Sequence, residues 1–88
     1  MASKARPFIY IAYWSKGNLV KIGRSKTPHI RLSTFRAELG RNCLMIAKWP
    51  SEPREEQELH RRFKEYSVGK EWFRCEGELK TFVYGRHP

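Results

Sequence analysis

Residues 8–25, with the sequence FIYIAYWSKGNLVKIGRS, constrain the fold of this chain more than any other stretch. Residues 8–14 are almost all β-branched or aromatic, which favours a strand. Residues 15–18 supply turn chemistry, and residues 19–23 resume the strand pattern. The stretch therefore predicts a β-hairpin.

The expected register of this hairpin, with its turn centred on Lys16 and Gly17, gives it two unlike faces. Tyr10 lies opposite Gly23 and on a diagonal from Lys21, so these three residues share one face. A phenol, an ammonium group and a residue without a side chain suit an incoming phosphate, although the same face could simply be solvated. The other face has the composition of a buried one and carries Ile9, Ile11, Val20 and Ile22.

Charge narrows the class of partner. The chain has 18 Lys and Arg against 9 Asp and Glu, a formal net charge of +9, spread from Lys4 to Arg86. Together with five Phe, four Tyr and three Trp, this excess favours nucleic acid, most naturally DNA, as the ligand. No apolar run approaches the ~20 residues of a membrane-spanning helix, so no membrane partner is expected.

The 88 residues are expected to form one domain, 1–88, with a core at about 8–84 and frayed ends at 1–6 and 86–88. The N-terminal residues do not have the pattern of a signal peptide, so we expect a cytoplasmic protein. Cys43 and Cys75 have no partners at zinc-site spacing and are expected to be reduced thiols, with Cys43 in the core.

Two longer helices are predicted beyond the hairpin. Thr27 and Pro28 have the pattern of a helix start, and the helix is expected to run to about Gly40. Arg31 lies on its first turn, from which its guanidinium can reach the polar face of the hairpin. The second helix is expected from Glu52 to about Tyr66, capped by Ser51. The buried stripe of the first helix is expected to be Leu32, Phe35 and Leu39.

Glu56 continues the apolar stripe of the second helix, which otherwise consists of Leu59, Phe63 and Tyr66. A carboxylate turned toward a basic cleft is what a bound divalent cation requires. The alternative is that Glu56 answers the helix dipole and pairs with His60, one turn later.

The remaining segments complete an α+β fold. A strand is expected at residues 43–49, a turn at 68–70, a short strand or extended segment at 71–73 and a short helix at 78–84. The predicted architecture is a small antiparallel three-stranded sheet in β-β-α-β-α order, flanked by helices.

These motifs resemble the GIY-YIG nuclease superfamily, in the phage-type branch whose second signature is KIG. Phe8-Ile9-Tyr10 stands in place of GIY, with Phe8 replacing the glycine, and Lys21-Ile22-Gly23 follows at the family's eleven-residue step from Tyr10. Residues 56–63, EQELHRRF, are similar to the branch's E-x-x-L-H-x-x-F element. Glu71, Trp72 and Phe73 match its EWF motif, in which the glutamate replaces the asparagine of distant relatives.

The resemblance implies a catalytic site. Glu56 would hold a single Mg²⁺ or Mn²⁺, and Arg31 would neutralise the non-bridging phosphate oxygens. Tyr10 would orient or deprotonate the attacking water, with Lys21 favouring the phenolate or binding phosphate itself. His60 would orient Glu56 or act as the base. Gly23, Glu71, Trp72 and Phe73 would support the site.

The expected function is a metal-dependent endonuclease with little intrinsic sequence specificity, which a partner protein could direct. Arg24, Arg36, Arg41, Arg61 and Arg62, together with Lys21, are expected to follow the nucleic-acid backbone. One alternative is an inactive nucleic-acid-binding module on the same fold. Another is a protein-interaction factor, such as an inhibitor, that uses its basic face on an acidic partner.

Overall fold

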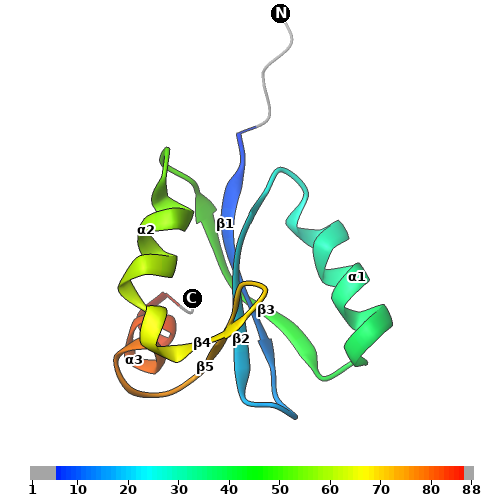
Figure 1. The fold of residues 1–88 in the computed structure, drawn as a ribbon. Coiled ribbons are helices and arrows are strands. Elements are labelled where there is room, and N and C mark those ends of the chain that lie inside the picture. Colours follow the sequence, from blue (N-terminus) through cyan, green and yellow to red (C-terminus); the bar gives the residue numbers. More distant parts are fainter. Residues whose placement is uncertain (1–5, 87–88) are drawn as a thin grey trace, which may run out of the picture.

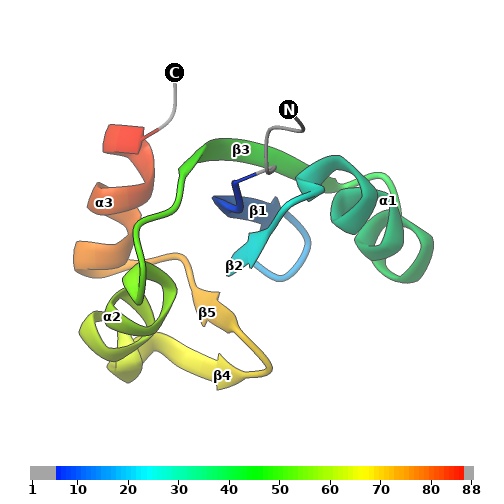
Figure 2. The ribbon, with the colours of Figure 1, turned by 90° about the horizontal axis from the view of Figure 1, so that it is seen from above.

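A computed structural model describes residues 6–86 of the chain, and the predictions for residues 1–5 and 87–88 lie outside this range. The described part is a five-stranded antiparallel sheet in the order β3-β1-β2-β5-β4. Helix α1 covers one face, and helices α2 and α3 cover the other (Figures 1 and 2). In chain order the elements are β1 Phe8–Trp14, β2 Leu19–Ser25, α1 Pro28–Leu39, β3 Cys43–Pro50, α2 Glu55–Arg62, the 3₁₀ turn Lys64–Tyr66, β4 Ser67–Gly69, β5 Trp72–Arg74 and α3 Gly77–Arg86.

The structure confirms the α+β prediction and enlarges the sheet from three strands to five. The extended segment after the predicted turn is β5, which pairs with β2. Residues Ser67–Gly69 then pair with β5 as β4. These strands have three residues each, too few for an alternating pattern to reveal.

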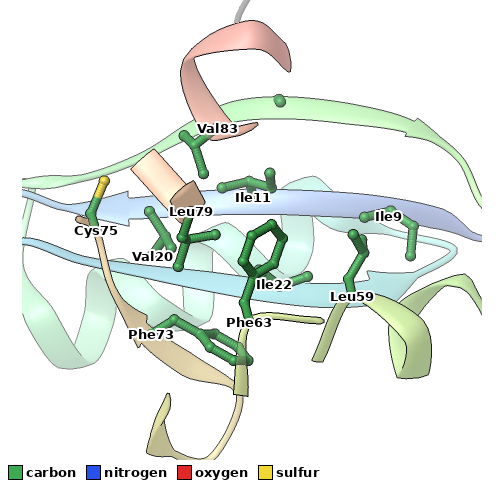
Figure 3. Close-up of a cluster of buried hydrophobic side chains, with 11 residues drawn as sticks. Ile9, Ile11, Val20, Ile22, Leu59, Phe63, Phe73, Cys75, Leu79 and Val83 are labelled. Atoms are coloured by element: carbon green, nitrogen blue, oxygen red, sulfur yellow. The ribbon is translucent and has the colours of Figure 1, made fainter. Parts of the chain in front are cut away.

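The hairpin has the predicted register, with Tyr10 opposite Gly23. Its apolar face forms the main core with α2 and α3 (Figure 3). Leu59 of α2, Leu79 and Val83 of α3, and Phe63 directly after α2 pack against the strand residues Ile9, Ile11, Val20 and Ile22. Alternation along two strands therefore fixes which sheet face receives the last two helices.

The polar face of the hairpin is also covered, so the interpretation of Tyr10 and Lys21 as solvated residues is wrong. Tyr10 is 1 % exposed and Lys21 7 %. They lie beneath α1, whose Phe35 packs in a second cluster with Tyr10 and Cys43. Hydrophobic packing from α1 therefore encloses two groups that the sequence placed at an open face.

Both predicted helix starts need correction in detail. Thr27 holds the N-cap position of α1 but makes no side-chain cap; its own N–H donates to Ser25 Oγ at 2.9 Å. Helix α2 begins at Glu55 because Arg54 before it is left-handed, with φ 67°. Glu55 Oε1 accepts from Glu52 N–H at 2.9 Å, and Ser51 does not cap the helix.

The ends of the last two helical predictions also differ. Helix α2 stops at Arg62, and Lys64–Tyr66 continues as a 3₁₀ turn. The last helix includes Arg86, which was expected to be frayed. Its guanidinium carbon lies 4.4 Å from the centre of the Trp49 ring, a cation–π contact that holds the end of α3 against β3. Within residues 6–86, no helix is both long and apolar enough to cross a membrane.

Candidate active site at the free edge of strand β2

The candidate site lies where β2 loses its neighbour. Strand β5 pairs with β2 only from Leu19 to Lys21, and Ile22 N–H then donates to Glu71 O at 3.2 Å. Within the described residues, no strand pairs with that edge of β2 beyond Ile22. His60 Nε2 of α2 instead lies 2.7 Å from Ile22 O. A backbone carbonyl can only accept, so Nε2 is the donor.

Glu56, His60 and Glu71 converge at this edge. One ligand atom of each residue lies within 4.8 Å of the other two. Burial raises the pKa of the Glu56 carboxyl, and the negative charge of Glu71 adds to the rise, while His60 and Arg24 oppose it. The combination of two carboxylates and an imidazole is able to hold a divalent cation.

Tyr10 and Arg31 approach from the α1 face. Burial raises the pKa of the Tyr10 phenol, against the hydrogen bonding and charge of Arg31. The charges of Glu71 and Glu56 raise this pKa further, so the phenol and the carboxylates share one electrostatic environment. Arg31 reaches the polar face of the hairpin, as its position on the first turn predicted.

The pKa of Tyr10 is raised by burial, which contradicts the expectation that Lys21 favours the phenolate. Lys21 Nζ donates to Lys70 O at 3.1 Å and lies 3.6 Å from a carboxylate oxygen of Glu71. Nζ also lies 5.0 Å from the Phe35 ring centre and 5.4 Å from that of Trp72. These contacts favour a positioning role, in which Lys21 holds the turn that carries Glu71, over direct binding of phosphate.

Trp72 and Phe73, the other two residues of the EWF motif, pack around the site. The Trp72 ring packs edge-on against Phe35, with centroids 5.9 Å apart, and both rings lie close to Lys21 Nζ. Phe73 is buried on the opposite face, and its ring centre lies 5.1 Å from that of His60. The EWF segment thus places one residue at the site and one on each side of the sheet.

A comparison with known protein families decides the relationship of this chain. The family model of the T5orf172 domain matches residues 7–83, from the residue before β1 into α3. The chain belongs to the T5orf172 domain family. This domain is found in phage and bacterial proteins associated with nucleases. No curated protein and no solved structure matched the chain.

Gly23 does not leave the T5orf172 domain open to an incoming group, which corrects the expectation from the sequence. A Cβ at this position would lie 2.5 Å from Tyr10 Cζ and would also collide with the phenol oxygen. The phenol therefore occupies the space that the missing side chain leaves. Gly23 is required because it admits Tyr10 to its buried position.

Gly23→Ala is accordingly expected to destabilise the domain by about 1–3 kcal/mol, the usual cost of overpacking. The measurement is the free energy of unfolding from urea denaturation. Gly85→Ala is the control, because a Cβ there meets nothing within 4 Å and the position is helical. A Gly23→Ala variant as stable as Gly85→Ala would contradict this account of the Tyr10 pocket.

Glu56→Gln is expected to stabilise the metal-free domain at pH 7. The pKa of Glu56 is raised above its ordinary value of 4.5, so the folded protein binds this proton more tightly than the unfolded chain. The resulting stability is present below pH 4.5 and is lost as pH rises through the raised pKa. Glutamine removes that loss, for a gain below ~1 kcal/mol because solvent screens the half-buried group.

Thermal unfolding in EDTA checks this prediction. A gain of 1 kcal/mol would raise the unfolding midpoint by about 4–8 °C, so at pH 7 the midpoint of Glu56→Gln should exceed that of the wild type by a smaller amount. The difference should shrink toward pH 4. Glu58 is an exposed glutamate of the same helix, and Glu58→Gln should leave the unfolding midpoint unchanged at both pH values. A lower midpoint for Glu56→Gln at pH 7 would show that the carboxylate stabilises the fold.

The predicted backbone-tracking arginines of the T5orf172 domain have different surroundings. Arg24 follows Gly23 on β2, is exposed and acts electrostatically on Glu56, so it lies at the site. Arg36 Nε donates to Cys43 O at 3.0 Å and ties α1 to β3. The guanidinium of Arg62 lies over the rings of Phe63 and Phe82. Arg41 and Arg61 are exposed.

Sequence reasoning underestimated Glu71, which it treated as a supporting residue. The four-residue spacing from Glu56 to His60 shows that these two can meet on one helix face. Glu71 joins them only because it directly precedes β5, whose pairing with β2 ends at Lys21. Strands β4 and β5 have three residues each, too few for a sequence pattern to predict this pairing.

Proposed function

We propose that this T5orf172 domain is a divalent-metal-dependent endonuclease that cleaves phosphodiester bonds in nucleic acid, DNA above all. The observation that carries the proposal is the cluster of Glu56, His60 and Glu71 at the edge of β2. The two carboxylates of this cluster also raise the pKa of the Tyr10 phenol, which Arg31 contacts. The similarity of residues 8–10 and 21–23 to the GIY-YIG signatures supports the same reading.

The residues at the site fit a divalent cation. Carboxylate oxygens are the preferred ligands of Mg²⁺ and Mn²⁺, and Glu56 presents one from a half-buried position. Glu71 brings a second negative charge to the same place. A bound divalent ion would supply a Lewis acid that polarises the phosphate and stabilises the leaving oxygen.

The protein residues have separable tasks in this proposal. The guanidinium fork of Arg31 binds the non-bridging oxygens and neutralises the charge that develops on them. The raised pKa of Tyr10 keeps its phenol protonated at neutral pH, so the phenol orients the attacking water by hydrogen bonding. Arg31 in turn holds the phenol through its own contact with Tyr10.

Binding to the nucleic-acid backbone follows from charge. The formal net charge of +9 attracts any phosphate chain, so we expect little intrinsic sequence preference. Specificity would then come from a directing protein partner. Steep salt dependence of binding is the expected signature of this mode.

The test of the proposed function compares cleavage with binding in the wild type. Supercoiled plasmid and a labelled single-stranded oligonucleotide are incubated with Mg²⁺, with Mn²⁺ and with EDTA, and affinity is measured at several salt concentrations. Cleavage that needs metal and stops with EDTA supports the nuclease. Salt-dependent binding without cleavage in either metal would identify a binding module, and no salt-dependent binding would favour a protein partner.

A further inference from the structure

The metal-binding part of the candidate site contains more potential ligands than the single carboxylate indicated by the sequence. The ligand atoms of Glu56, His60 and Glu71 lie within 4.8 Å of one another. Bonds of about 2.1 Å to one ion place ligand atoms up to about 4.2 Å apart. The observed separations of at most 4.8 Å are therefore close to those of ligand atoms on one ion.

The hydrogen bond of His60 to the backbone leaves one ring nitrogen available to a metal ion. Its Nε2–H donates to Ile22 O at 2.7 Å, which leaves Nδ1 of the neutral ring with a free lone pair. Histidine ligands in metalloproteins almost always donate their other ring N–H to a carbonyl, carboxylate or water in this way. The nearby Phe73 ring, 5.1 Å away between centroids, further limits rotation of the imidazole.

Glu71 is held at the site by two features. It follows Lys70 in a turn in which both residues have a left-handed backbone, with φ 51° at Lys70 and 70° at Glu71. This conformation costs energy for residues with a side chain. Lys21 Nζ contacts the backbone of this turn and the Glu71 carboxylate. The side chain remains 40 % exposed, so an ion from solvent can reach it.

The convergence of two carboxylates also requires an electrostatic explanation. The chain has only 9 acidic residues against 18 basic ones, yet two of the acids lie side by side with a histidine. Two ionised carboxylates at this separation repel each other, and a proton or a cation reduces the repulsion. Lys21 Nζ, 3.6 Å from Glu71, already supplies one positive charge. A divalent ion bound to both carboxylates removes this repulsion.

We propose that Glu56, His60 and Glu71 together ligate one divalent ion, and that the imidazole makes the site prefer Mn²⁺ to Mg²⁺. Mg²⁺ favours oxygen ligands and retains its waters, whereas imidazole nitrogen binds first-row transition ions more readily. This inference rests on the proposed function for the use of the ion, and it extends the protein ligands from one to three.

Isothermal titration calorimetry of the full chain, stripped of metal with EDTA, measures the affinity for each ion and so tests the three proposed ligands. The wild type should bind MnCl₂ at least about 10-fold more tightly than MgCl₂. Glu71→Gln should weaken the binding of both ions by about 10- to 100-fold. His60→Gln should weaken Mn²⁺ binding by a similar factor and Mg²⁺ binding less, so the preference narrows. Glu58→Gln and His29→Gln, both exposed, are the matched controls and should bind both ions as the wild type does.

Pulsed electron paramagnetic resonance of the Mn²⁺ complex gives a direct signature. The wild type should show coupling of the Mn²⁺ electron spin to one imidazole nitrogen, and His60→Gln should lose this coupling. Thermal unfolding of each variant confirms that it is folded, and Glu71→Gln, at a partly exposed turn, tests the ligand set independently of the His60 contact with β2.

The outcomes separate this inference from the proposed function when Glu56→Gln is measured in parallel. Loss of Mn²⁺ binding in Glu56→Gln alone, with no nitrogen coupling in the wild type, would overturn the three-ligand site and leave the nuclease proposal standing. A wild type that binds neither ion in the absence of nucleic acid would overturn the three-ligand site, whereas the nuclease proposal is decided by the cleavage assay with metal and with EDTA. Reduced Mn²⁺ affinity in His60→Gln and in Glu71→Gln would support the three-ligand site.

Discussion

Glu56→Gln should lower the rate of metal-dependent cleavage by about 10³-fold or more and leave the affinity for nucleic acid nearly unchanged. Glutamine has the shape of glutamate but no negative charge, so the variant loses the central ligand of the proposed ion. Lewis-acid stabilisation of a phosphoryl transition state contributes several kcal/mol, and about 4 kcal/mol corresponds to 10³-fold in rate. The measurement is the single-turnover rate on a labelled oligonucleotide, with affinity determined in parallel.

Glu58→Gln is the matched control for this loss. Both glutamates are on α2, but Glu58 is exposed and lies outside the cluster at the edge of β2. Its substitution removes the same charge from the same helix and should change the rate less than about twofold. A Glu56→Gln variant that cuts within about tenfold of the wild type would show that the reaction does not depend on this carboxylate.

Arg31→Gln should reduce cleavage by about 10²- to 10³-fold, the usual effect of removing one donor aimed at developing negative charge. The Arg31 guanidinium lies next to the phenol that is proposed to orient the water. Removing it therefore affects both the charge on the phosphate and the position of Tyr10. Single-turnover rates at saturating protein report this effect without a contribution from weaker binding.

Arg31→Lys distinguishes the two properties of this side chain. Lysine keeps the positive charge but lacks the planar fork that matches two phosphate oxygens, so it should restore only part of the rate. Arg41→Gln, an exposed arginine in the turn after α1, is the control for general loss of charge. Equal loss of rate in Arg41→Gln and Arg31→Gln would indicate that Arg31 contributes only to backbone attraction.

The features that sequence predicted well are those that depend on local periodicity. Two-residue alternation and the turn at Lys16-Gly17 fixed the hairpin register, and with it the buried face that includes Ile9 and Ile22. Pro28 and Gly40 bounded α1 because their backbone preferences are local. The helical spacing of Leu59 and Phe63 correctly predicted that Glu56 continues the inward face of α2.

The features that sequence could not predict depend on contacts between distant segments. Tyr10 and Lys21 are buried because α1 folds over them, which the hairpin pattern alone does not encode. The role of Gly23 depends on the rotamer of Tyr10 across the strand pair. The position of Glu71 depends on where the pairing of β5 with β2 ends.

A double-mutant cycle between Arg31 and Glu56 tests most directly the claim that the two faces of the sheet supply one active site. Single-turnover cleavage rates are measured for the wild type, Arg31→Gln, Glu56→Gln and the double variant. Residues that act as a unit on one phosphate are strongly non-additive, so the double variant should be little slower than Glu56→Gln alone. Rate losses that multiply fully in the double variant would show that Arg31 and Glu56 act independently and would contradict a single shared site.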